Sequence, residues 1–145
     1  MGITYAEILL SNTGDIANFE RGNIVESQVR TTSVNALVDT KTRTLVIKEE
    51  IREKLGLSIK GLRRSSLADS SKQVYKITEP VTIRWKDRET DCRAVVVPSA
   101  EEVLLGVIPL EDMDLTVNPV KQQLEGAHGD EPLLILKKLK EKDLL

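Results

Sequence analysis

The sequence has very few aromatic residues, one cysteine, one histidine and no long apolar run. Aromatic residues make up 3% of the chain, and Cys92 and His128 are the only residues of their types. A single cysteine excludes an internal disulfide. One cysteine and one histidine supply too few ligands for a Cys/His metal site. No apolar run approaches the ~20 residues of a membrane-spanning helix, and the N-terminus lacks the features of a signal peptide. We therefore expect a cytoplasmic protein with no metal, no cofactor and no membrane partner.

The composition that remains favours one aliphatic core. Apolar residues make up 40% of the 145 residues, so the core must be built from Leu, Ile and Val. This length suits a single domain. The net charge is −2 with both signs interspersed, which gives no nucleic-acid footprint, and Arg63-Arg64 reads as solvated surface charge. We expect one domain over residues 1–136 and a charged tail over residues 137–145.

Short apolar segments separated by turn residues predict a mainly β domain with one or two short helices. A turn is expected at 12–15, a hairpin around 69–72, another turn at 86–87 and a short helix from Pro109 through Met113. The predicted strands cover residues 3–10, 24–34, 36–40, 45–47, 62–68, 73–77, 81–85, 91–97, 115–117 and 133–136.

One segment has a clear helical pattern. Ile51 and Leu55 follow Ile47 at intervals of four residues, which places them on one face of a helix over residues 48–55. Acidic residues occupy its first turn, and Gly56 suits its C-terminal end. We expect this face to be buried.

One apolar strand ends on an acid. Residues 36–42 read Ala-Leu-Val-Asp-Thr-Lys-Thr, so Asp39 lies at the tip of an aliphatic strand, where a reaction centre can be held rigidly. An ordinary Asx turn is the alternative reading of Asp39 and Thr40. The chain has no second motif of this kind, because Asp69-Ser70 follows two apolar residues but lies among turn residues.

The segment resembles the active-site strand of retropepsin-like aspartic proteases, which reads two apolar residues, Asp-Thr/Ser-Gly, then Ala, Thr or Ser. The later hairpin and Leu104-Leu105-Gly106 follow in the order and spacing of the single-domain bacterial and archaeal members. The resemblance covers most of residues 5–136. It implies a closed β-barrel with a hairpin flap that covers a peptide or protein substrate.

The resemblance also implies the roles of individual residues. With one motif in each chain, the two carboxylates of the active site must come from a homodimer in which Asp39 meets its copy. Asp39 is then catalytic, and the Thr40 hydroxyl braces the two active-site loops. The expected substrate-binding residues are Lys41, Thr42, Ala68, Asp69 and Ser70.

The motif departs from the family at Lys41, which stands where the family has Gly. If its ammonium points inward, it keeps Asp39 ionised and weakens or abolishes hydrolysis; if it points outward, some activity survives. Ser70 likewise replaces a frequent Gly of the flap. The alternatives are therefore a weakened aspartic endopeptidase, an inactive peptide-binding or assembly module on the same fold, and an unrelated small β-barrel interaction domain.

Overall fold

The computed structural model describes residues 2–66, 72–134 and 136. Strands dominate this part of the chain, and none of its helices is long and apolar enough to cross a membrane. The strands are β1 (Tyr5–Asn12), β2 (Thr31–Val38), β3 (Leu45–Ile47), β4 (Ile59–Ser66), β5 (Lys72–Trp85), β6 (Arg88–Val96), β7 (Leu104–Leu105), β8 (Leu115–Asn118) and β9 (Gln123–Gly126). The helices are α1 (Thr13–Glu20), α2 (Glu49–Leu55), α3 (Val107–Asp112) and a short 3-10 helix (Glu26–Gln28).

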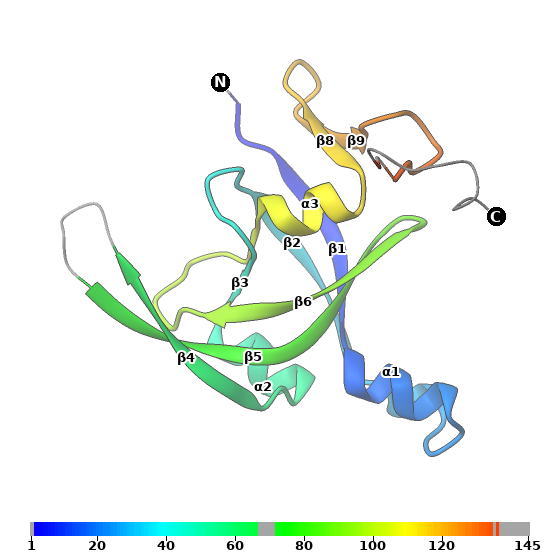
Figure 1. Ribbon diagram of the computed structural model, residues 1–145, viewed down its shortest axis with the longest axis vertical. Coiled ribbons are helices and arrows are strands. Elements are labelled where there is room, and N and C mark those ends of the chain that lie inside the picture. Colours follow the sequence, from blue (N-terminus) through cyan, green and yellow to red (C-terminus); the bar gives the residue numbers. More distant parts are fainter. Residues whose placement is uncertain (1, 67–71, 135, 137–145) are drawn as a thin grey trace.

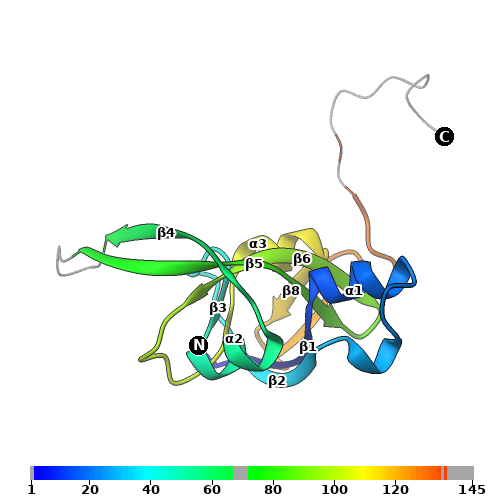
Figure 2. The same ribbon diagram turned by 90° about the horizontal axis from the view of Figure 1, so that it is seen from below.

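The main sheet closes on itself. Its strand order is β1-β2-β7-β3-β6-β5-β4, and β1 also pairs with β5, so the first six of these strands form a ring. The last strand, β4, pairs only with β5, and the two form a hairpin that projects beyond the ring on the side of β3 (Figures 1 and 2). The expected mainly β architecture with a projecting hairpin is confirmed, and the described residues form three α-helices rather than one or two.

The interior of the ring is aliphatic, as the scarcity of aromatic residues requires. Leu10, Leu45 and Leu105 come from different strands and are fully buried. Helix α2 covers one end of the ring with Leu55, which is also fully buried, while Ile51 packs partly buried against the same core. Gly56 ends this helix in the left-handed conformation, so the predicted helix and its buried face are confirmed.

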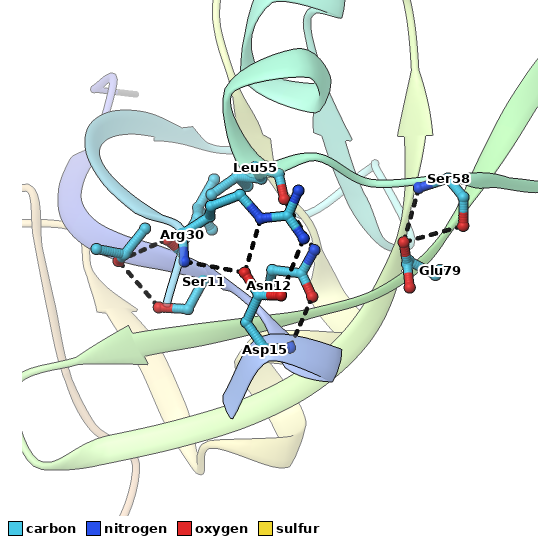
Figure 3. Close-up of polar contacts among 9 residues, drawn as sticks. Ser11, Asn12, Asp15, Arg30, Leu55, Ser58 and Glu79 are labelled. Atoms are coloured by element: carbon cyan, nitrogen blue, oxygen red, sulfur yellow. Dashed lines mark hydrogen bonds and ion pairs between the residues drawn. The ribbon is translucent and has the colours of Figure 1, made fainter. Parts of the chain in front are cut away.

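The turn predicted at residues 12–15 is wrong, because these residues begin helix α1. Asn12 is its N-cap, and its Oδ1 accepts a hydrogen bond from the Asp15 backbone N at 3.0 Å, while its Nδ2 donates to the Leu55 carbonyl at 2.8 Å. Arg30 holds the other side: its backbone N, Nε and Nη2 all donate to the Asp15 carboxylate (Figure 3). Asn and Asp are common in turns, but here their side chains cap helix α1 and attach it to Leu55 and Arg30.

Four predicted strands also need correction. The expected strand at 24–34 contains the 3-10 helix, and β2 begins only at Thr31. The strands predicted at 73–77 and 81–85 are the single strand β5, whose pairing with β6 is irregular between Ile77 and Pro80. Residues 133–136 were expected as a strand, but Leu133 and Leu134 are exposed and outside any strand. The predicted charged tail at 137–145 lies outside the described residues.

The strand missed near the C-terminus is β9, which pairs with β8 as a separate two-stranded sheet. Arg88 attaches this sheet to the ring: its buried guanidinium donates to the carbonyls of Met113, Asp114 and Gly129. A buried arginine needs such partners, because an unpaired charge would be strongly destabilising there. The apolar pattern alone does not reveal this contact.

Candidate functional site

Asp39 follows the last residue of β2 and begins a tight turn. Its backbone N donates to the Leu105 carbonyl at 3.0 Å, and its own carbonyl accepts from the Thr42 backbone N at 3.1 Å. The carboxylate is held as well: Oδ1 accepts from the Lys41 backbone N at 3.0 Å, and Oδ2 accepts from the Thr42 hydroxyl at 2.7 Å. Each carboxylate oxygen has two lone pairs, so both retain the capacity to bind a water or a substrate group.

A second segment supports this loop from behind. The backbone N of Val107 donates to the Thr42 carbonyl at 2.8 Å, and that of Ile108 donates to the Arg43 carbonyl at 2.8 Å. Gly106 directly precedes Val107 and Ile108, and a Cβ atom there would approach the Thr44 carbonyl oxygen to 2.2 Å. The Leu104-Leu105-Gly106 segment therefore lies directly against the Asp39 loop.

Lys41 is accommodated without left-handed backbone. Among the described residues, only Lys86, Asp114 and Gln122 combine a side chain with positive φ. The Lys41 amide serves the Asp39 carboxylate, as any residue's amide can, while its side chain is exposed. Thr40 is also exposed.

A cavity of about 630 Å³ opens next to this loop, between it and the β4–β5 hairpin. Thr42 is the one predicted substrate-binding residue that lines the cavity; Ala68, Asp69 and Ser70 lie outside the described residues. The lining residues are Thr42, Arg43, Thr44, Val46, Arg63, Arg64, Ser65, Tyr75, Ile77, Arg93, Val95, Val97 and Ile108.

Most of this lining was not predicted from the sequence. From the sequence we interpret Arg63-Arg64 as solvated surface charge, and no sequence pattern marks Arg93 as part of a site. Strand register would have placed Arg63 in the cavity, because Arg63 pairs with Tyr75 across the hairpin. The sequence alone does not show which residues pair, so it could not give this register.

Two other polar features lie elsewhere in the chain. A second hollow of about 580 Å³ shares no lining residue with the first and lies beside β1 and the Trp85–Lys86 turn. His128 is exposed, and its Nδ1 lies 2.9 Å from the Asp114 carboxylate. The Leu133 backbone N–H and then His128 hold the pKa of Asp114 below its usual value. Neither feature includes the Asp39 loop.

Comparison with known proteins gives the family. Among curated proteins there is no match. Among solved structures, the EIAV protease complexed with the inhibitor HBY-793 is 25% identical, with a TM-score of 0.43, over 56% of this chain and 77% of that one. A family model described as aspartyl protease matches residues 25–108, more than half of the chain, and this range includes the Asp39 loop, the hairpin and the Gly106 segment. The chain belongs to the aspartyl protease family.

Proposed function

We propose that two copies of this chain assemble about a two-fold axis at Asp39 and form a peptide-hydrolysing site with one carboxylate from each copy. The observation that carries this proposal is the Asp39 carboxylate at a strand tip, oriented by the Lys41 amide and the Thr42 hydroxyl. Aspartic proteolysis requires two adjacent carboxylates that share a proton, and the chain supplies one. A symmetric dimer supplies the second.

In such a site the two carboxylates divide the work. The ionised one takes a proton from the attacking water and later gives it to the leaving amine. The protonated one donates its proton to the peptide carbonyl oxygen and recovers it when the carbonyl re-forms. The peptide lies extended between the Asp39 loop and the β4–β5 hairpin, with side chains entering the cavity. Thr40 of both copies braces the two loops, and Thr42 contacts the peptide.

Lys41 makes this hydrolysis slow. Its side chain extends from the loop that carries Asp39. In the proposed dimer, a positive charge near the two carboxylates favours the doubly ionised pair, in which no proton is shared. The same observation favours a second function, a peptide-binding or assembly module that retains the dimer and the cavity without hydrolysis. The two differ in one measurable property, which is whether a bound peptide is cut.

The test compares the native chain with Lys41→Gly, Asp39→Asn and the distant control Lys60→Gln. Peptide mixtures are incubated at mildly acid pH and products are followed by mass spectrometry, while sedimentation reports the oligomeric state. We expect a dimer, slow cleavage by the native chain and Lys60→Gln, faster cleavage by Lys41→Gly and none by Asp39→Asn.

Each other outcome has a distinct meaning. A strictly monomeric chain at high concentration contradicts the shared site. Efficient cleavage that Lys41→Gly leaves unchanged contradicts the role assigned to Lys41 but not the site. A dimer that binds peptides and never cuts them, in any variant, supports the binding module instead.

A further inference from the structure

The described lining of the cavity beside Asp39 is rich in arginine and contains no carboxylate. Arg43, Arg63, Arg64 and Arg93 all contribute to it, and no described Asp or Glu does. The chain as a whole has a net charge of −2, so this concentration of positive charge does not follow from the composition. It is a local property of the cavity.

Strand register places two of these arginines on the cavity face. Arg63 pairs with Tyr75 across the hairpin, and Ile77 pairs with Val95 across β5 and β6. Paired residues share a face of a sheet, as do residues two apart on a strand. Arg63 and Arg93 therefore lie on the same face as the apolar residues that line the cavity. Arg43 joins them from the loop, next to Thr42.

Within the described residues these arginines have no acidic partner. The ion pairs of that part of the chain involve Arg30, Arg52, Arg84 and His128 instead. The side chains of Arg43, Arg63 and Arg93 are exposed. No described carboxylate neutralises their charge, which can pair with the carboxylates of a ligand.

The remainder of the lining is mostly aliphatic. Val46, Val95 and Val97 lie beside Ile77 and Ile108 in the same wall. The volume of about 630 Å³ suits a few side chains of an extended peptide. Apolar walls with few aromatic faces are poorly suited to nucleic-acid bases, which bind by stacking.

We propose that this cavity selects peptide segments in which an aliphatic residue is flanked by glutamate or aspartate. The inference rests on the proposed function and adds the substrate class to it. The aliphatic side chain packs against the apolar wall, and the neighbouring carboxylates pair with the guanidinium groups of Arg43, Arg63 and Arg93. Arginine forms two parallel hydrogen bonds with a carboxylate, which favours acidic residues over neutral ones of similar size.

The test uses three fluorescein-labelled peptides with the same Leu-Val centre and flanking Glu, Gln or Lys residues. Binding to the full native chain is followed by fluorescence anisotropy, with mass spectrometry to confirm that the peptides remain intact. We expect the Glu peptide to bind about tenfold more tightly than the Gln peptide, equivalent to about 1.4 kcal/mol. This preference should decrease as salt is raised from about 50 mM to about 300 mM, because salt screens exposed charges.

Matched variants assign the effect to the cavity. Arg63→Gln and Arg93→Gln should each weaken binding of the Glu peptide about threefold and leave binding of the Gln peptide unchanged. Lys60→Gln also removes one positive charge, from strand β4, which carries Arg63 as well, but Lys60 lies outside the cavity lining. This variant should change the binding of neither peptide. Circular dichroism checks that each variant is folded.

Four results would overturn the inference. Equal binding of the Glu and Gln peptides would remove the charge preference while leaving the peptide site of the proposed function intact. If Lys60→Gln weakens binding of the Glu peptide as much as Arg63→Gln does, the preference comes from the overall charge of the protein and not from the cavity. A single-stranded oligonucleotide that binds as tightly as the Glu peptide would replace the peptide as ligand. If no peptide binds, the inference and the proposed function both fail.

Discussion

The close approach of Gly106 to the Asp39 loop leads to a sharp prediction for Gly106→Ala. The added Cβ atom would lie 2.2 Å from the Thr44 carbonyl oxygen and 2.6 Å from the Thr42 carbonyl oxygen. Both are backbone atoms, so no side chain can rotate away. The loop and the β7–α3 segment must therefore move apart, by about 0.8 Å or more if the shortest contact is to reach a tolerable distance.

The cost follows from the hydrogen bonds that join the two segments. The bonds from Val107 to Thr42 and from Ile108 to Arg43 are both 2.8 Å long, and such a movement would take them beyond hydrogen-bonding distance. Each is worth about 0.5–1.5 kcal/mol, and overpacking adds about 1–3 kcal/mol. We expect Gly106→Ala to lower the free energy of unfolding by about 2–6 kcal/mol.

The assay is urea unfolding followed by the fluorescence of Trp85, the one tryptophan, which packs partly buried against the core. For a slope of about 2 kcal/mol per molar urea, the midpoint should fall by roughly 1–3 M. Gly61→Ala is the matched control, because a Cβ atom at Gly61 meets nothing within 4 Å. A Gly106→Ala midpoint equal to that of the native chain, or an equal loss in Gly61→Ala, would refute the reasoning.

Three other predictions test the packing and the charges. Leu55→Ala should lower the free energy of unfolding by about 2–5 kcal/mol, since Leu55 is fully buried under the ring; an unchanged urea midpoint would contradict this. The Arg30 hydrogen bonds hold the pKa of Asp15 below its usual value. Their contribution to the free energy of unfolding is therefore present above about pH 4 and is lost as the pH falls through the lowered pKa. The stability difference between the native chain and Asp15→Asn, measured by urea unfolding, should therefore shrink from pH 6 to pH 2.5, and a constant difference would count against it. Burial raises the pKa of the Cys92 thiol, so it should react with a disulfide reagent at pH 8 more slowly than after unfolding, and equal rates would show that the thiol is accessible.

Features that depend on neighbours along the chain were predicted from the sequence. Helix α2 was expected over residues 48–55 and spans Glu49–Leu55, because the spacing of Ile51 and Leu55 and the stop at Gly56 all act within that segment. The turn between β5 and β6 was likewise expected, and Lys86 adopts positive φ there. The aliphatic strand that leads to Asp39 belongs to the same class of local signal, and the aspartyl protease family was recognisable from it.

Features that depend on distant parts of the chain were decided only by the tertiary structure. Asn12 and Asp15 suit a turn and a helix start equally well, and helix α1 is selected because Asn12 reaches Leu55 and Asp15 reaches Arg30. The cavity has the same origin. Arg63 and Arg93 come from strands that are not neighbours, and only the register of β4, β5 and β6 brings them to one face. The sequence by itself determined that an acid lies at a strand tip, whereas the closure of the ring, which pairs residues far apart in the chain, decided what surrounds it.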